Sequence, residues 1–359
     1  MSKTLKVLIM AGGTGGHIYP ALACSEEFKK QGIEAVWLGS KGGMEERLIG
    51  QATEIPLHLL SIKGVRGKGV LGLFIAPFRI VYSIGQALSI LRREKPDVVL
   101  GMGGFVAGPG GIAAKLLAIP LVIHEQNAIA GTTNRLLSRF CDLALCAFDG
   151  ALKKGLTLGN PIRSAITENV NRERKFDNAR PLKVLVVGGS LGAKAINDVI
   201  PQVLKNWGCS PRLSIWHQTG SKNYDEVLSS YHSFDLDSRV EAFVENMDAA
   251  YYWADLVICR AGAMTVSELS LIGLPSILVP YPFAIDDHQT ANAHSLQKCD
   301  AAIVVPQKEF TVEKTTCLLK EFVNDRARLQ KMGENAKKMS FPNATKDVVS
   351  QCLGQIKND

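Results

Sequence analysis

Near the start of the chain stands Lys6-Val-Leu-Ile-Met-Ala-Gly-Gly-Thr-Gly-Gly16, a short apolar run that ends in a glycine-rich turn, and a helical pattern follows from Ala21 to Gln31. Much later, Lys183-Val-Leu-Val-Val-Gly-Gly-Ser-Leu-Gly192 has the same pattern, again with a helical stretch behind it. Each stretch predicts a strand, a tight turn and a helix. The sequence therefore contains the same opening unit twice, once in each half.

Further strand-like runs alternate with helical patterns along the whole chain. These runs are apolar on both faces, which is typical of parallel sheets that helices cover on both sides. The 359 residues fit about two domains, and the polar stretch from Thr167 to Pro181 is typical of a linker between them. We therefore predict an α/β fold of two parallel-sheet domains that face a central cleft. The other predicted strands are 35–38, 98–100, 121–123, 143–147, 213–217, 240–243, 256–259, 276–279 and 302–305.

The composition excludes several classes of protein. Hydrophobic residues make up 46% of the chain and charged residues 21%, which is close to the average for soluble globular proteins and excludes wholesale disorder. No apolar stretch reaches the roughly 18 residues that a membrane-spanning helix needs. The cysteines form no C-x-x-C pair, so we expect reduced thiols in the cytoplasm and no zinc site. The net charge of +7 favours anionic partners but is too small to indicate nucleic acid.

Glycine-rich turns between a strand and a helix can hold a phosphate, because backbone N–H groups and the positive end of the helix can approach it closely. The clusters at 12–16, 101–111 and 188–192 therefore favour a diphosphate-bearing ligand, although Gly-Gly turns could also serve only to close the connections between strands and helices. A dehydrogenase is less well supported. In the Gly-x-Gly-x-x-Gly fingerprint of dinucleotide-binding proteins, Ile18 takes the place of the third glycine, and no acidic residue ends the second strand, where one would bind the adenine ribose. No Gly-Lys-Ser/Thr follows any cluster, which excludes a P-loop.

Polar side chains follow several predicted strands. His17 opens a helix and could act as a general base, or could only hydrogen-bond its own loop. The run His124–Asn127 ends another strand, where four consecutive polar residues favour a ligand site over core packing. In the second half, Thr265 and Ser267 can donate to phosphate and Glu268 can accept from ribose hydroxyls. By itself, Glu268 could equally be a solvated carboxylate near a helix start.

The chain carries six ordered motifs: Gly12-Gly-Thr-Gly-Gly-His17, Gly101-Met-Gly-Gly-Phe-Val-Ala-Gly-Pro-Gly-Gly111, His124-Glu-Gln-Asn-Ala-Ile-Ala-Gly131, Gly159-Asn-Pro-Ile-Arg163, Val187-Gly-Gly-Ser-Leu-Gly-Ala193 and Ala263-Met-Thr-Val-Ser-Glu268. Together they closely resemble glycosyltransferase family 28, and in particular its bacterial UDP-N-acetylglucosamine transferases that glycosylate lipid I. The resemblance implies the GT-B fold, in which two Rossmann-like parallel-sheet domains face a central cleft. It also implies an N-terminal acceptor and membrane-associating domain over 1–162, completed by a C-terminal helix over 340–359, and a UDP-N-acetylglucosamine-binding domain over 163–339.

Carried over position by position, the resemblance implies a donor site with contributions from both domains. It places Thr14, Gly15 and Gly16 near the diphosphate, Asn127 and Gln289 near the sugar, Arg163 and Ser190 on the nucleotide, Val244 at the uracil, and Ala263, Met264, Thr265, Val266, Ser267 and Glu268 around ribose and phosphate. Two positions depart from the family pattern. Leu191 stands where glutamine is common, so only a contact through its backbone would survive, and Asp287-His288 replaces the charged and amide residues common before Gln289.

The implied reaction transfers N-acetylglucosamine from UDP-N-acetylglucosamine to the C4 hydroxyl of MurNAc in undecaprenyl-diphospho-MurNAc-pentapeptide (lipid I). It proceeds with inversion and gives lipid II and UDP in peptidoglycan synthesis. His17 is the expected general base and Glu125 the second candidate. Helix N-termini and glycine-loop amides would stabilise the leaving diphosphate without a metal or another cofactor. Asp235-Leu-Asp237 has the pattern of the metal motif in other glycosyltransferases, but we expect a turn there.

The stretch from Ser61 to Arg93 contains basic and large apolar residues but no acidic residue. It could be a buried helix with solvated basic ends. A lipid-linked acceptor favours instead a surface that rests on the anionic cytoplasmic face of the bacterial inner membrane. The residues expected to associate with the membrane are Lys63, Arg66, Lys68, Leu73, Phe74, Ile75, Phe78 and Arg79. The resemblance also implies a peripheral location and cell-wall synthesis and division proteins as partners, with no nucleic acid.

Three other functions remain open on the sequence. One is a GT-B enzyme that uses UDP-N-acetylglucosamine with a different acceptor, and another is a UDP-N-acetylglucosamine epimerase, which shares the fold and the nucleotide. A non-catalytic nucleotide-sugar or nucleic-acid-binding protein would explain the basic stretch and the glycine loops, but not His17 and Asn127.

Overall fold

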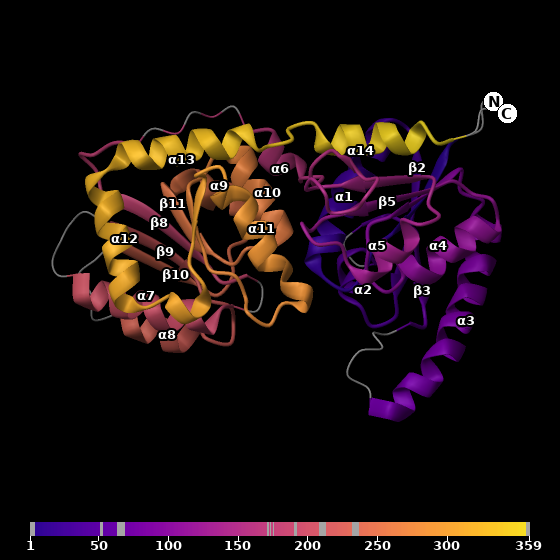
Figure 1. The fold of residues 1–359 in the computed structure, drawn as a ribbon, viewed down its shortest axis with the longest axis horizontal. Helices are drawn as coiled ribbons and strands as arrows, with labels where there is room; N and C mark the ends of the chain where they lie inside the picture. The colour runs from indigo at the N-terminus through magenta and orange to yellow at the C-terminus, as the bar shows by residue number, and fades with distance from the viewer. Residues whose placement is uncertain are drawn as a thin grey trace. The chain divides into compact units, whose positions relative to one another are not determined.

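The computed structural model describes residues 4–50, 53–62, 69–170, 172, 174, 176–189, 192–207, 213–231 and 237–356, with the backbone alone at 69–75 and 285. The chain divides into two compact units, shown in Figure 1. The N-terminal unit consists of Met1–Ser164 and Asn343–Asp359, and the C-terminal unit of Ala165–Pro342. Arg163, which the sequence assigns to the second domain, therefore falls in the N-terminal unit.

Within the described residues, the N-terminal unit holds a seven-stranded sheet in the order β3-β2-β1-β4-β5-β6-β7, and every pairing is parallel. The strand order reverses between β1 and β4, and ligands of open α/β sheets bind at such a switch point. The strands are β1 Lys6–Met10, β2 Glu34–Ser40, β3 Leu57–Leu60, β4 Val98–Gly101, β5 Leu121–Glu125, β6 Leu143–Cys146 and β7 Leu156–Thr157. The helices are α1 Gly15–Lys30, α2 Met44–Leu48, α3 Gly69–Glu94, α4 Ala107–Leu116, α5 Thr132–Leu137 and α14 Ala344–Leu353.

The apolar run of β1 reflects burial on both faces of this sheet. Val7 and Ile9 pack in one cluster with Phe28 of α1, whereas Leu8 and Met10 pack in another with Ala113 of α4. Successive side chains of a strand point to opposite faces, so both sets must be apolar when helices cover both sides. The glycines of α4 serve this packing, since a Cβ at Gly110 would lie 2.2 Å from Met10 Sδ. At Gly110, therefore, glycine meets a packing requirement.

Helix α14 follows the C-terminal unit in sequence but packs in the N-terminal unit. Its residues Val348, Val349 and Cys352 are completely buried in the same cluster as Ile18 and Phe28 of α1. Figure 1 shows α14 lying along α1. The core of the N-terminal unit thus includes residues from near the C-terminal end of the sequence.

The C-terminal unit repeats the architecture with a six-stranded parallel sheet in the order β10-β9-β8-β11-β12-β13, again counted within the described residues. Its strand order reverses between β8 and β11. The strands are β8 Leu182–Val187, β9 Leu213–Gln218, β10 Asp237–Glu241, β11 Leu256–Cys259, β12 Ser276–Leu278 and β13 Ala302–Val304. The helices are α7 Lys194–Trp207, α8 Tyr224–Tyr231, α9 Met247–Trp253, α10 Ala263–Ile272, α11 His288–Gln297, α12 Val312–Asn324 and α13 Arg326–Lys338, with single 3₁₀ turns η1 Ile285–Asp287 and η2 Gln307–Glu309; α6 Ser164–Thr167 lies at the unit boundary.

The prediction of two Rossmann-like parallel-sheet domains is confirmed, but several local predictions are wrong. The sequence pattern missed strands β3 and β7. It also placed a strand at 240–243 where β10 runs from Asp237 to Glu241. Asp237 was expected in a turn, but it pairs with Ser214 of β9, whose hydroxyl donates to Asp237 Oδ2 over 2.6 Å. Asp235 lies outside the described residues.

His217, in β9, is completely buried in a polar network. Its Nε2 lies 3.1 Å from Asn197 Oδ1, and its Nδ1 lies 2.9 Å from the Tyr231 hydroxyl. A neutral ring satisfies both contacts, with Nε2–H donating to the amide oxygen and Nδ1 accepting from the tyrosine. Burial lowers the pKa of His217 to about 3.

We expect acid to destabilise the chain through His217. Because its folded pKa of about 3 lies below the unfolded value of roughly 6.5, the unfolded state binds more protons between these values. The contribution of His217 is complete above about pH 6.5 and is lost progressively as the pH falls towards 3. In urea titrations, the loss of unfolding free energy between about pH 7 and pH 5 should be smaller in His217→Gln by about 2 kcal/mol. The same pH dependence in both proteins would contradict this.

Candidate functional site

His17 lies at the switch point of the N-terminal sheet. Strand β1 ends at Met10, the turn follows, and α1 begins at Gly15 with Thr14 as its N-cap residue. The Thr14 carbonyl accepts from the backbone N–H groups of His17 and Ile18, which starts the helix. Thr14, Gly15 and Gly16 thus form the N-terminal end of a 16-residue helix, where the helix dipole favours an anion.

One hydrogen bond fixes the tautomer of the His17 ring. His17 Nδ1 lies 3.1 Å from the Gly12 carbonyl oxygen. A carbonyl oxygen only accepts, so Nδ1 carries the proton and the lone pair of the neutral ring is on Nε2. This is the form of histidine that takes up a proton through Nε2.

A second glycine loop, after β4, packs directly against the first. A Cβ at Gly103 would lie 3.0 Å from His17 Cδ2, and a Cβ at Gly104 would lie 2.3 Å from the Gly12 carbonyl oxygen. Both glycines have positive φ angles, +100° and +84°. This approach is possible only without side chains, and it confines the His17 ring and the carbonyl that orients it.

The run His124–Asn127 lies at the end of β5, and the strand continues to Glu125, two residues further than predicted. His124 is completely buried, and its Nε2 lies 2.9 Å from the Gly159 carbonyl oxygen, so Nε2–H donates to it. Burial lowers the pKa of His124 to about 4. His124 is therefore a neutral side chain that connects β5 to the loop at Gly159.

The Glu125 carboxylate is held by the loop that follows it. Oε1 accepts from the backbone and side-chain N–H groups of Asn127 over 3.0 and 3.3 Å. Oε2 accepts from the Gly131 backbone over 3.1 Å and from Asn134 Nδ2 over 2.9 Å. Glu125 is also only 2% exposed. These contacts favour a role in shaping the loop of Asn127, and they favour His17 over Glu125 as the base.

Arg163 lies near the end of the N-terminal unit. Its guanidinium carbon is 5.1 Å from the centre of the Tyr19 ring on α1, close enough for a cation–π contact. Of the predicted donor-site residues, the N-terminal unit thus contains Thr14, Gly15, Gly16, Asn127 and Arg163.

In the C-terminal unit, the other predicted residues follow the carboxyl ends of neighbouring parallel strands. Val244 follows β10, Ala263–Glu268 form the start of α10 after β11, and Gln289 opens α11 after β12. Carboxyl ends of parallel strands meet at one edge of a sheet, so these segments share that edge. Ser190 and Leu191 lie outside the described residues.

Two of these side chains already make hydrogen bonds. Glu268 is 6% exposed, and its Oε2 accepts from the Tyr251 hydroxyl of α9 over 2.9 Å. Gln289 Oε1 accepts from the Tyr281 backbone N–H over 2.9 Å, which orients its side-chain NH₂ as a donor. Just before Gln289, Asp286 and Asp287 both adopt left-handed backbone conformations, with φ of +52° and +53°. The departure from the family pattern at Asp287 thus falls in an unusual turn.

Gln218, the last residue of β9, was not singled out by the sequence. Its Oε1 accepts from the Gly189 backbone N–H over 3.1 Å, while its Nε2 donates to the carbonyls of Gly189 and Ala242, each over 3.0 Å. One buried amide therefore connects the glycine loop after β8 to the segment that leads to Val244. The sequence did contain a signal for Gln218, because a polar residue at the carboxyl end of a buried strand is the same pattern that pointed to His124.

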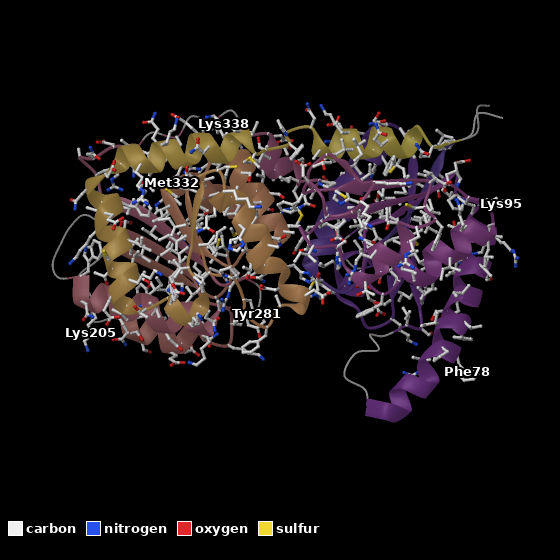
Figure 2. All side chains as sticks on the ribbon, viewed as in Figure 1. Phe78, Lys95, Lys205, Tyr281, Met332 and Lys338 are labelled. Atoms are coloured by element: carbon white, nitrogen blue, oxygen red, sulfur yellow. The ribbon has the colours of Figure 1, made fainter. Side chains whose placement is uncertain are left out.

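The N-terminal half of α3 exposes apolar side chains. Phe78 is 77%, Val81 68% and Tyr82 62% exposed, and Ile80 and Arg79 are exposed beside them. The opposite side of α3 buries Ala76, Ser83, Ala87 and Leu91. Figure 1 shows this end of α3 extending beyond the sheet, and Figure 2 labels Phe78 on it. The alternative of a buried helix is therefore wrong for 77–82.

The other residues expected at the membrane are not all described. Lys63, Arg66 and Lys68 lie outside the described residues, as do the side chains of Leu73, Phe74 and Ile75. In the part of the chain that is described, no helix has the length and apolar character that crossing a bilayer requires. In the same part, no group of three or more His, Cys, Asp and Glu side chains is arranged to hold a metal ion.

Comparison with known proteins identifies relatives of both units. Residues 7–146 match the Glycosyltransferase family 28 N-terminal domain, and residues 183–348 match the Glycosyltransferase family 28 C-terminal domain. The UDP-N-acetylglucosamine--N-acetylmuramyl-(pentapeptide) pyrophosphoryl-undecaprenol N-acetylglucosamine transferase of Marinobacter nauticus is 49% identical over 97% of each chain. The crystal structure of Acinetobacter baumannii MurG, 37% identical, aligns over 98% of this chain and 99% of that one with a TM-score of 0.83. A UDP-GlcNAc 2-epimerase from Neisseria meningitidis has a TM-score of 0.68 at 15% identity, which shows a common fold alone.

Proposed function

This chain belongs to glycosyltransferase family 28, and from that membership we propose that it transfers N-acetylglucosamine from UDP-N-acetylglucosamine to the C4 hydroxyl of MurNAc in lipid I. The products are lipid II and UDP, and the step belongs to peptidoglycan synthesis. The observation that carries the proposal is the 49% identity to a transferase of this name over 97% of both chains. The epimerase likeness, at 15% identity, supports the fold and not that activity.

In this reaction, His17 acts as the general base. Nε2 takes the proton of the C4 hydroxyl while the hydroxyl oxygen attacks C1 of N-acetylglucosamine. The bond between C1 and the diphosphate oxygen breaks on the opposite face, so the configuration inverts and UDP leaves with the negative charge. The hydrogen bond from Nδ1 to the Gly12 carbonyl supports this role, because it keeps the lone pair on Nε2.

The remaining site residues bind the donor. In the N-terminal unit, the backbone N–H groups at the start of α1 are suited to stabilise a diphosphate, where negative charge develops as UDP leaves. In the C-terminal unit, the start of α10 is suited to bind ribose and phosphate. Glu268 binds the ribose, Val244 the uracil, and the NH₂ of Gln289 donates to the sugar. Asn127, Arg163 and Ser190 complete the donor contacts.

The assay that tests this function is UDP release from UDP-N-acetylglucosamine with and without a lipid I analogue. Release that requires the analogue, together with formation of a disaccharide product, is the expected result. Release without any acceptor, or interconversion of the sugar to its 2-epimer, would point to one of the other functions instead.

Gln218 should affect donor binding selectively. Gln218→Met keeps the side-chain volume but removes three hydrogen bonds to the Gly189 loop and Ala242. We expect the KM for UDP-N-acetylglucosamine to rise about tenfold, with kcat and the acceptor KM changing less than about threefold. Gln297→Met, on the exposed side of α11, is the control and should behave as wild type. An unchanged donor KM in Gln218→Met would show that its loops do not bind the donor.

We propose that the exposed part of α3 is the membrane-associating surface, with the chain peripheral on the cytoplasmic face of the bacterial inner membrane. The apolar side chains of Phe78, Val81 and Tyr82 would enter the interface, and Arg79 would contact anionic headgroups. A lipid-linked acceptor makes such a surface useful, because its sugar lies close to the headgroups. Association with cell-wall synthesis and division proteins stays a prediction.

Binding to liposomes tests this surface. Wild-type protein should sediment with vesicles that contain anionic lipid, and binding should weaken as salt is added. Phe78→Ser combined with Tyr82→Ser should reduce binding about tenfold. Phe283→Ser is a matched control, because Phe283 of the C-terminal unit is 78% exposed against 77% for Phe78. Binding that ignores lipid charge and salt, or that Phe283→Ser reduces equally, would contradict the proposal.

A further inference from the structure

Glu45 is a buried acidic residue whose role the sequence motifs do not explain. It lies in the short helix α2, and its exposed fraction is 0%. Oε1 accepts from the Ser40 backbone N–H over 2.7 Å and from the Ser40 hydroxyl over 2.6 Å. Oε2 accepts from the Gly13 backbone N–H over 3.1 Å. The carboxylate therefore connects the end of β2 to the glycine loop after β1.

Three glycines make room for this carboxylate. A Cβ at Gly12 would lie 2.4 Å from Glu45 Oε1, one at Gly39 would lie 2.6 Å from Cγ, and one at Gly43 would lie 2.4 Å from Oε2. No side chain fits at these positions while Glu45 keeps its place. Gly12 of the first glycine cluster, together with Gly39 and Gly43, thus makes room for a buried protein carboxylate, and the same cluster leads into the start of α1.

The contact of Glu45 with Gly13 reaches His17 through a single peptide group. The N–H of Gly13 and the C=O of Gly12 belong to the same planar peptide unit and point in opposite directions. The N–H donates to Glu45 Oε2, and the C=O accepts from His17 Nδ1 over 3.1 Å. Carboxylate, peptide and imidazole thus form one line of hydrogen bonds, in which each bond polarises the next.

We propose that Glu45 is a positioning residue of the transferase, which holds the Gly12–Gly13 peptide in the orientation that keeps the proton of His17 on Nδ1. The carboxylate holds the N–H of this peptide, and His17 donates to its C=O on the opposite side. When Nε2 takes a proton from the acceptor, the same line of hydrogen bonds stabilises the imidazolium. The inference rests on the proposed function, in which His17 is the general base.

The geometry requires a carboxylate and not an amide. Oε1 faces the Ser40 N–H and Oε2 faces the Gly13 N–H, and both of these groups only donate. A glutamine has one acceptor oxygen, so either orientation would place its NH₂ against a backbone N–H. Glu45→Gln therefore has nearly the same shape but breaks one of the two connections.

The test compares Glu45→Gln with Glu46→Gln in the full chain. Glu46 is the next residue of α2, and its carboxylate also accepts from a loop N–H, that of Gly42 over 2.7 Å, but it is exposed. We expect kcat of Glu45→Gln to fall about tenfold, with both KM values within about twofold of wild type. Glu46→Gln should match wild type. A folded Glu45→Gln with wild-type kcat would overturn the proposal.

Two further measurements separate positioning from general support of the fold. In a His17→Ala background, Glu45→Gln should cause no further loss of kcat, because a residue that acts through His17 has nothing left to position. An additional loss there equal to that in the wild-type background would overturn the proposal. Nitrogen NMR of the wild-type protein should show the neutral His17 ring protonated at Nδ1, and protonation at Nε2 would overturn it whether or not Glu45→Gln folds. Acceptor-dependent UDP release by the wild-type chain tests the proposed function independently.

Discussion

Replacing His17 by alanine should lower kcat by about a hundredfold or more while UDP binding stays nearly unchanged. The imidazole removes a proton only as the acceptor hydroxyl attacks, so its loss raises the barrier of the chemical step. The diphosphate contacts proposed at Gly15 and Gly16 come from backbone groups, which alanine at position 17 leaves in place. Steady-state kinetics with a lipid I analogue gives kcat, and calorimetric titration gives the UDP affinity.

His294→Ala is the control for this experiment. His294 lies on the exposed side of α11 in the C-terminal unit, so its removal should leave kcat within about twofold of wild type. If His17→Ala retained most of its turnover, His17 would lose the role of base, and Glu125 would become the next residue to test.

Replacing Gly104 by alanine should damage both the stability and the activity of the N-terminal unit. The added Cβ would lie 2.3 Å from the Gly12 carbonyl oxygen and 2.9 Å from its carbon, and these backbone atoms cannot rotate away as a side chain could. Positive φ at this position adds strain for any residue with a Cβ. We expect the unfolding free energy to fall by about 3 kcal/mol and kcat to fall at least tenfold, roughly, because the displaced carbonyl orients His17.

Gly42→Ala is the control that separates the two effects of the added Cβ, its collision with neighbouring atoms and the strain of a positive φ angle. Gly42 has a similar φ of +75°, but a Cβ there meets nothing within 4 Å. Its cost should be only the strain, about 1 kcal/mol, with wild-type kcat. Equal losses of stability in the two variants, measured by urea titration, would show that the two glycine loops do not pack as closely as described.

The central strands of both sheets could be predicted because burial on both faces makes their sequences continuously apolar. Strands at the sheet edges carry a weaker signal. β7 has only two residues, β3 includes the polar His58, and β10 reads Asp-Ser-Arg-Val-Glu because its side chains are only partly buried. Those strands form because they pair with a neighbouring strand, and the local sequence pattern does not show which segment that neighbour is.

The residues of the candidate site also differ in how far the sequence could reveal them. Glycine clusters, His17 and the polar run at His124 could be recognised because they follow apolar strands directly. Gln218 also ends an apolar strand, but its contact with Gly189, 29 residues away in sequence, leaves no mark in the local pattern. Glu45 follows no apolar strand directly, and it acts on Gly13, 32 residues away in sequence. The resemblance to known transferases points to residues that would touch substrate. It does not point to the buried polar groups that hold those residues in place.

The position of α14 has a consequence for how the protein is made. The ribosome completes the N-terminal sheet early, but Val348, Val349 and Cys352, which bury their side chains against α1, emerge only after the whole C-terminal unit has been synthesised. Until then, an apolar face on α1 and β4 lacks its cover. The nascent N-terminal unit should therefore be a client for chaperones during translation, and it should become resistant to proteases only once the last turns of the chain have docked.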